Sequence, residues 1–155
     1  RRDLLRGRPH PEPRRTRPPG VSQQSLPACT ACGKCVDACP EHILHITKGL
    51  VALDPEAGEC TFCGECAAAC PEGVIAADGA MAHVMQISDD CLVKAGIACM
   101  TCRDVCPETA ISMRPRIGGP FLPELDATSC TGCAACSAAC PADAIHAVER
   151  VPENV

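Results

Sequence analysis

The chain has 155 residues, including sixteen cysteines but no Trp, no Tyr and only two Phe. This length suggests one domain or two small ones, and the scarcity of large side chains excludes an ordinary hydrophobic core. Residues 1–20 contain seven arginines against two acidic residues and carry a net charge of +5. Because the whole chain has a net charge of −5, residues 21–155 carry −10. An acidic body of this kind argues against nucleic acid as a partner and suits a basic protein surface.

Residues 1–25 form a leader rich in arginine and proline, then in serine and glutamine. The composition predicts a disordered or extended segment, either a solvated tail or a docking peptide for an acidic partner or a membrane surface. The start Arg1-Arg2-Asp3-Leu4-Leu5 faintly resembles a twin-arginine export signal, but the polar, proline-rich residues 6–11 that follow argue against one. No apolar run is long enough to be a transmembrane segment. We therefore expect a soluble, cytoplasmic protein, in a compartment where thiols stay reduced.

Four cysteine motifs follow the leader, and three share the spacing C-x2-C-x2-C-x3-C-P. These three are Cys29, Cys32, Cys35, Cys39; Cys60, Cys63, Cys66, Cys70; and Cys130, Cys133, Cys136, Cys140. The remaining motif, with a lengthened beginning, is Cys91, Cys99, Cys102, Cys106. In bacterial ferredoxins this spacing lets three thiolates hold one cubane while the fourth reaches its neighbour. Disulfide scaffolds and structural zinc sites do not need it. The sequence therefore predicts four 4Fe–4S clusters.

Short elements are predicted around these motifs along the chain. Residues 43–47 and 50–53 form a tight hairpin around Lys48-Gly49. Residues 63–70 and 133–140 form short alanine-rich helices that stop at proline. Residues 110–113 and 144–148 are short strands. The fifth residue after each closing cysteine is aliphatic and is expected to shield a cluster from water: Leu44, Ile75, Ile111, Ile145.

The predicted fold is α+β, a tandem pair of bacterial two-cluster ferredoxin-like units with short strands and helices around a core of clusters. The first unit spans residues 26–85 and the second spans residues 86–150, with residues 151–155 as a tail. Because the clusters would be the core, metal binding should be coupled to folding, and the iron-free chain should be largely unfolded.

The exchange of the fourth cysteine assigns the ligands of each cluster. Cluster 1 takes Cys29, Cys32, Cys35 and Cys70; cluster 2 takes Cys60, Cys63, Cys66 and Cys39; cluster 3 takes Cys91, Cys99, Cys102 and Cys140; cluster 4 takes Cys130, Cys133, Cys136 and Cys106. Regular spacing would place a cysteine at Gly96, so a larger loop through Lys94-Ala95-Gly96 must return Cys91 to its cluster. The alternative is a three-iron or labile site with Cys91 free. The long loop predicts an easily lost cluster in either case.

The remaining candidate residues are interpreted without a chemical role. His42, His45, His83 and His146 are expected at the surface or beside the ligands, because the thiols already fill every ligand position. We find no nucleophile–base pair, no GxGxxG motif and no phosphate loop, so neither catalytic residues nor enzyme activity are predicted.

With these residues, the chain resembles the NapF-type ferredoxins encoded with periplasmic nitrate reductases. Beyond the cysteine motifs, the resemblance lies in the arginine-rich start, Arg17-Pro18-Pro19, the long-gap motif from Asp90 to Cys106, and Arg114-Pro115. It implies a cytoplasmic accessory protein that interacts with the molybdenum-containing catalytic subunit of the reductase before export. The family's proposed role is to help install or energise the 4Fe–4S cluster of that subunit. The residues carried over are the sixteen cysteines.

Two functions stay open at this point. One is a maturation factor that supplies iron–sulfur or electrons to the immature reductase, and the other is a general electron-transfer ferredoxin or wiring subunit of a redox complex. The basic leader and the irregular Cys91 site favour the maturation factor, because cluster transfer needs lability whereas a wire needs its clusters fixed.

Overall fold

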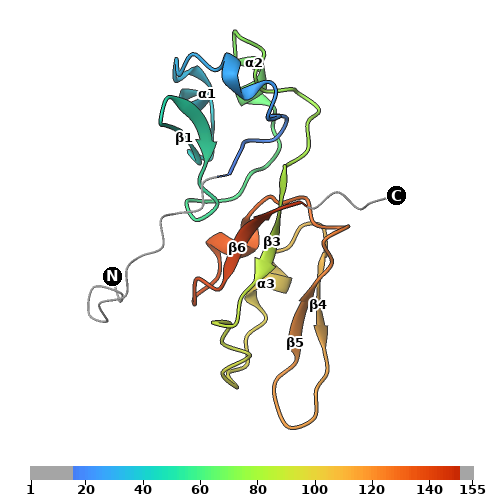
Figure 1. Ribbon diagram of the computed structural model, residues 1–155. Coiled ribbons are helices and arrows are strands. Elements are labelled where there is room, and N and C mark those ends of the chain that lie inside the picture. Colours follow the sequence, from blue (N-terminus) through green and yellow to red (C-terminus); the bar gives the residue numbers. More distant parts are fainter. Residues whose placement is uncertain (1–15, 151–155) are drawn as a thin grey trace, which may run out of the picture.

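The computed structural model describes residues 16–150, which fold into two halves, one above the other in Figure 1. The first half, residues 16–81, is built around a core that includes Ile43, Leu53 and Ile75. The second half, residues 82–150, has its own core, which includes Met85 and Ile145. Cysteines belong to both cores. The apolar side chains and the thiols therefore share one interior in each half.

The first half contains one hairpin and three short helices. Its elements are η2 (Leu26–Ala28), α1 (Lys34–Asp37), β1 (Leu44–Thr47), β2 (Leu50–Leu53) and α2 (Glu65–Ala68). The strands β1 and β2 are antiparallel, with Leu44 opposite Leu53. The turn residues Lys48 and Gly49 both have positive φ, as a two-residue turn matched to the strand twist requires. The predicted hairpin is confirmed.

The second half contains two antiparallel strand pairs and two short helices. Its elements are β3 (His83–Ile87), α3 (Thr101–Asp104), β4 (Ile111–Arg114), β5 (Leu122–Leu125), α4 (Ala135–Ala138) and β6 (Ile145–Glu149). The strand β4 pairs with β5, and β3 pairs with β6, so that His83 lies opposite Glu149. The beginning and the end of this half are thus joined. The unit boundary proposed between residues 85 and 86 falls inside β3.

Each of the helices α1 to α4 contains the third cysteine of one motif and ends just before the closing Cys-Pro, because proline has no N–H to continue a helix. The helices predicted within residues 63–70 and 133–140 are confirmed as α2 and α4. Three of the helices follow a residue in the left-handed region, Gly33, Gly64 or Ala134, whereas α3 follows Met100 at φ −131°. The long motif therefore enters its helix by a different path.

The segment before the first cysteine motif is folded, contrary to the expectation of disorder up to residue 25. Thr16 and Leu53 exchange backbone hydrogen bonds of 3.0 and 2.7 Å. The Gly20 amide donates to the Ala80 carbonyl, and the Gly20 carbonyl accepts from the Ala76 amide, both at 3.2 Å. Residues 16–25 therefore belong to the first half. The rest of the predicted leader, residues 1–15, and the predicted tail, residues 151–155, lie outside the described residues.

Candidate metal centres

The cysteines predicted for cluster 1 meet at one cavity of the first half. Cys29, Cys32 and Cys35 come from the first motif and Cys70 from the second. Aliphatic side chains complete the wall: Ile46, Val51, Val74 and Ile75. The chain thus brings a cysteine from 35 residues further along the sequence to a pocket otherwise formed by one loop and its hairpin.

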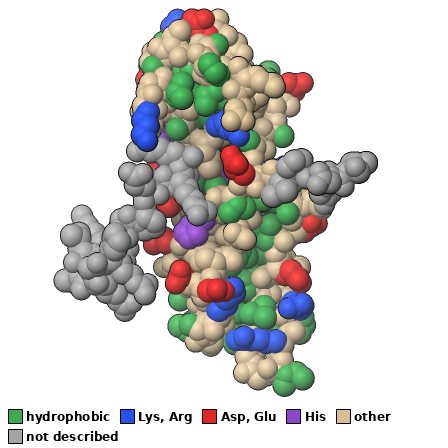
Figure 2. Space-filling model, viewed as in Figure 1, with side chains coloured by type: hydrophobic (Ala, Val, Ile, Leu, Met, Phe, Trp, Pro, Cys, Tyr) green, Lys and Arg blue, Asp and Glu red, His purple; other side chains and the backbone are tan. Residues whose placement is uncertain are grey.

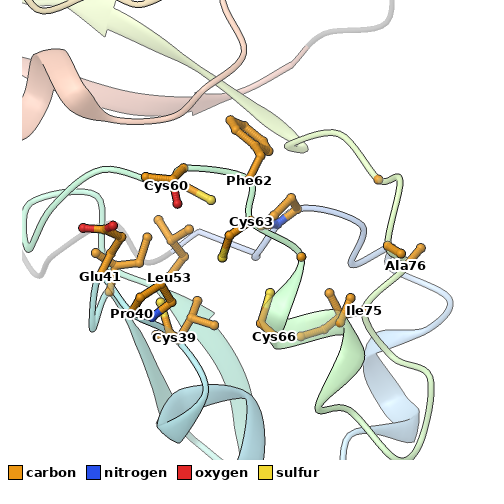
Figure 3. Close-up of a pocket in the computed structure, with 18 residues that line it drawn as sticks. Cys39, Pro40, Glu41, Leu53, Cys60, Phe62, Cys63, Cys66, Ile75 and Ala76 are labelled. Atoms are coloured by element: carbon orange, nitrogen blue, oxygen red, sulfur yellow. The ribbon is translucent and has the colours of Figure 1, made fainter.

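The cysteines predicted for cluster 2 line a second cavity of the same half. Figure 3 shows the sulfur atoms of Cys60, Cys63 and Cys66 turned toward one another, with Cys39 below them. Leu53 is fully buried in the wall and Ile75 is 4% exposed, whereas Phe62 is 41% exposed. Ile75 lines both cavities of this half, so one side chain is placed to shield two neighbouring sites from water.

The irregular motif also closes around a cavity. Cys91, Cys99, Cys102 and Cys140 line it together with Ile87 and Ile145. The loop that returns Cys91 is a compact turn, in which the Lys94 amide donates to the Cys91 carbonyl (2.9 Å) and the Ile97 amide to the Leu92 carbonyl (2.9 Å).

The outer part of this loop is exposed, yet its inner edge is fixed. The Arg116 guanidinium, on the β4–β5 connection, donates to the carbonyl of the fully buried Val93 (3.1 Å). Residues 94–98 are exposed, whereas Cys102 is buried and the other three thiols are half-buried. The loop is thus exposed, as the sequence suggested, but the cysteines behind it are less exposed than Cys32 and Cys63 of the first half.

The cysteines predicted for cluster 4 gather around Cys136. Burial, together with the nearby thiols of Cys130, Cys133, Cys102 and Cys106, raises the pKa of the Cys136 thiol to about 12. Cys102 belongs to the set predicted for cluster 3, so the two sets of this half are neighbours. Iron binds the thiolate, and loading each site must therefore release protons that the buried thiols otherwise hold.

The cysteine sets fit multi-iron clusters better than single ions. A tetrahedral zinc site brings its four sulfur atoms within about 3.8 Å of one another, because each lies about 2.3 Å from the metal. Within residues 16–150, no three or more His, Cys, Asp or Glu side chains are grouped closely enough to hold one ion. Three of the four sets instead surround a cavity with a largely apolar wall. Such a space suits a cubane, whose iron and sulfide atoms occupy the middle.

Several groups beside the thiols were not identified from the sequence. The Ala144 amide donates to the Cys140 sulfur (3.4 Å), and the Thr101 hydroxyl lies 3.6 Å from the Cys99 sulfur. Hydrogen bonds to a ligand sulfur raise the reduction potential of a cluster. The amide bond could have been anticipated only from the backbone geometry, since Ala144 has no polar side chain. Thr101 had a signal, because it stands between two predicted ligands.

His83 was expected either at the surface or beside the ligands, and the structure decides between the two. It is 3% exposed, and its Nε2 lies 3.0 Å from the carbonyl of Gly132, which stands between Cys130 and Cys133. Burial lowers the pKa of His83, so the ring is neutral at pH 7 and its Nε2 donates to that carbonyl. The expectation of a residue beside the ligands holds for His83, whereas His42 is exposed at the surface.

The described surface is acidic, in keeping with the charge calculated from the sequence. Residues 16–150 contain sixteen Asp and Glu against eight Lys and Arg. Acidic side chains are spread over both halves of the face shown in Figure 2, with basic ones among them. No helix within residues 16–150 is both long and apolar enough to cross a membrane.

Comparison with known proteins agrees with this geometry. Residues 28–74 and 97–144 each match the family model described as a 4Fe-4S dicluster domain. The chain is 38% identical over 152 residues to the ferredoxin-type protein NapF of Escherichia coli K12, covering 95% of this chain and 93% of that protein. It is also 38% identical over 137 residues to the ferredoxin-type protein NapF of Haemophilus influenzae, covering 83% and 76%.

Proposed function

The chain belongs to the NapF family of ferredoxin-type iron–sulfur proteins, and on that basis we propose that it carries four 4Fe–4S clusters in two tandem two-cluster units. The observation that supports this most directly is that three separate cavities are each lined by four cysteines, three from one motif and one from another. That is the ligand exchange of two-cluster ferredoxins.

The proposed ligands follow the same pairing, with the remaining set gathered around Cys136. They are Cys29, Cys32, Cys35 and Cys70 for cluster 1; Cys39, Cys60, Cys63 and Cys66 for cluster 2; Cys91, Cys99, Cys102 and Cys140 for cluster 3; and Cys106, Cys130, Cys133 and Cys136 for cluster 4. In this assignment Cys91 is a ligand and not a free thiol. Each cluster, when bound, stores and releases one electron at a time.

We propose that the protein acts in the cytoplasm as an accessory factor without enzyme activity of its own. Its partner would be the catalytic subunit of a periplasmic nitrate reductase before export, to which it would supply iron–sulfur or electrons. The family membership supports this partner. The acidic described surface supports an electrostatically steered encounter with a basic patch on another protein.

A general electron carrier is the second candidate, and the burial of the thiols favours it. In the second half Cys102, Cys130 and Cys136 are buried and the other five thiols are half-buried. Clusters held by such ligands are shielded from exchange with solvent, which suits a fixed wire better than a donor of whole clusters.

An iron-tracing experiment separates the two candidates. The protein is loaded anaerobically with labelled iron, mixed with cluster-free reductase catalytic subunit, separated and counted. Label on the reductase would support cluster supply. Label that stays entirely on this chain, together with reduction of an already loaded reductase, would leave electron supply as the function. A failure to bind or reduce the reductase would contradict the proposed partner.

The variant Cys91→Ser tests the least regular ligand within the same preparation. We expect its iron content to fall from about sixteen to about twelve per chain, since one four-iron site loses a thiolate. Ser88→Ala, three residues before it and outside every proposed ligand set, is the control and should keep the full content. An unchanged iron content in Cys91→Ser would show that Cys91 is not required.

A further inference from the structure

The two halves meet at a direct backbone contact between two proposed ligands. The Cys60 amide in the first half donates a hydrogen bond of 2.8 Å to the Cys133 carbonyl in the second half. Cys60 belongs to the proposed cluster 2 and Cys133 to the proposed cluster 4. The thiols of the same two residues are close enough to interact electrostatically.

Further contacts hold the Cys133 loop against the chain that connects the halves. The neighbouring Gly132 accepts a hydrogen bond of 3.0 Å from the buried His83 ring. Gly132 also approaches so closely that a Cβ there would lie 2.6 Å from the His83 carbonyl oxygen. Its φ of +80° is a conformation that glycine adopts without strain. The loop around Cys133 is therefore held in place by the close approach of the Gly132 backbone to His83 and by the hydrogen bond from the His83 side chain.

Within each half, the proposed ligand sets are interlocked. Each set takes one cysteine from the motif that forms the other set, and the helices that carry the third cysteines pack together, α1 on α2 and α3 on α4. Clusters 1 and 2 are therefore neighbours in the first half, and clusters 3 and 4 in the second. The Cys60–Cys133 contact adds a neighbour across the junction, between clusters 2 and 4.

We propose that the four clusters form a single line in the order 1–2–4–3, and that electrons cross between the halves from cluster 2 to cluster 4 or back at the Cys60–Cys133 contact. In the crossing, the donor cluster would lose one electron and the acceptor cluster would gain it. No bond would form or break, and no proton would move. This inference rests on the proposed function, because it needs all four clusters.

The line has two ends with different surroundings. At cluster 1, Cys32 is exposed to solvent, and at cluster 3 the exposed residues 94–98 lie between the half-buried ligands Cys91 and Cys99 in the sequence. A redox partner can approach either end; Cys63 of cluster 2 is exposed as well, whereas no thiol of cluster 4 is. The Cys60–Cys133 contact makes the molecule one connected conductor rather than two independent ferredoxins on one chain.

Electron paramagnetic resonance of ligand variants tests the order. Reduced cubanes are paramagnetic, and a neighbouring reduced cluster broadens the signal. Cys32→Ser removes the outer cluster 1 and leaves cluster 2 alone in its half. The matched Cys63→Ser removes the inner cluster 2 and leaves cluster 1 alone. Each variant is loaded, confirmed to hold about twelve irons, and reduced until about three spins per chain are observed.

We expect a sharp, unbroadened component of about one spin in Cys63→Ser, because cluster 1 has lost its neighbour. We expect no such component in Cys32→Ser, because cluster 2 is still adjacent to cluster 4. A sharp component of equal size in both variants would overturn the proposal, since the halves would then be magnetically isolated.

The mirror pair in the second half, Cys99→Ser and Cys133→Ser, repeats the test and replaces any variant that loses more than one cluster. We expect the sharp component in Cys133→Ser and its absence in Cys99→Ser. The proposed function fails separately, if the unaltered protein does not hold about sixteen irons; the line fails only when the clusters are present and the inner ones are uncoupled.

Discussion

The two halves are built from the same parts but are closed by different segments. In the second half, β3 precedes the motifs and pairs with β6 along five residues. In the first half, the segment at the corresponding place is residues 16–21, which makes one bridge from Thr16 to Leu53 and two hydrogen bonds through Gly20. The segment that precedes the cysteine motifs is thus a paired strand in the second half and an irregular segment without a ladder of strand hydrogen bonds in the first half.

The difference follows from the side chains available. Residues 83–87 read His-Val-Met-Gln-Ile, every one of which has an amide to donate and several of which favour strands. Residues 17–20 read Arg-Pro-Pro-Gly, in which Pro18 and Pro19 lack the N–H that a ladder needs. Pro18 is nevertheless fully buried. Closing a ferredoxin-like half therefore requires packing against its core, and a regular strand is one of two ways to achieve it.

The substitution with the largest expected effect on the closure of the first half is Gly20→Ala. A Cβ at residue 20 would lie 2.2 Å from the Ala76 carbonyl oxygen, and the φ of +74° adds strain. We expect a loss of about 2–5 kcal/mol in the free energy of unfolding, from overpacking and the left-handed backbone together. The denaturant midpoint of iron–sulfur absorbance, measured anaerobically, reports the change.

Gly49→Ala is the matched control, in the same half and at nearly the same φ of +77°, with no atom within 4 Å of the added Cβ. It should cost only about 1–2 kcal/mol, from the backbone conformation. Equal effects of the two substitutions would mean that residues 16–21 do not close the first half.

A smaller effect is expected from Ser137→Ala, which removes a contact that only the second half has. The Ser137 hydroxyl donates a hydrogen bond of 2.7 Å to the Ile145 carbonyl, which connects α4 to β6. Ser137 is 7% exposed. The corresponding residue in the first half is Ala67. We expect a cost of about 1–2 kcal/mol, because the buried carbonyl loses this partner.

The control for this substitution is Ser112→Ala, whose hydroxyl is exposed and 3.5 Å from its acceptor. It should change the same denaturant midpoint by an amount equivalent to less than about 0.5 kcal/mol. If Ser137→Ala were equally silent, α4 and β6 would be held together by packing alone.

The smallest expected effect is a pH dependence confined to the second half. Hydrogen bonds from Thr128 and Ser129 lower the pKa of Asp126 from 3.8 to about 2. Because the folded state has the lower pKa, the stabilisation is present above about pH 4 and is lost as the pH falls through about 2. Asp126→Asn should accelerate the loss of cluster absorbance after a pH jump, most at pH 5–7, with the ratio of rates approaching one toward pH 2.

Asp54 occupies the same place after β2 and accepts one hydrogen bond, from the Glu56 amide. Asp54→Asn should therefore change the rate less than Asp126→Asn at pH 6. A ratio of rates that does not vary with pH would rule out the ionised carboxylate of Asp126 as the source of the effect.

The repeated parts of the molecule could be predicted from the sequence. Residues 44–53 carry a hairpin signal in their own turn residues, and the helices around Cys66 and Cys136 end at a proline, so each depends on local chemistry. The four-cysteine sets were also predicted from the spacing, because it is the spacing of ferredoxins in which the fourth cysteine ligates the neighbouring cluster. Their ligation of iron stays a prediction.

The parts that depend on distant contacts could not be predicted. Nothing in residues 16–21 indicates that Gly20 must approach Ala76, because the composition of this segment is that of a solvated leader. The hydrogen bond from Cys60 to Cys133 joins two backbone groups, and backbone groups have no identity in a sequence. The role of His83 follows from the same junction, and its neighbours in sequence do not indicate it.

The pairing of β3 with β6 also sets an order in time. The chain is synthesised from its N-terminus, so residues 16–81 can complete their contacts while the second half is still being made. The strand β3 then has no partner until residues 145–149 leave the ribosome, and an unpaired strand edge invites pairing with other chains. Of the described elements, β6 is thus made last, and it protects the second half from aggregation; a ribosome that stalls before Ile145 leaves the first half attached to an open edge.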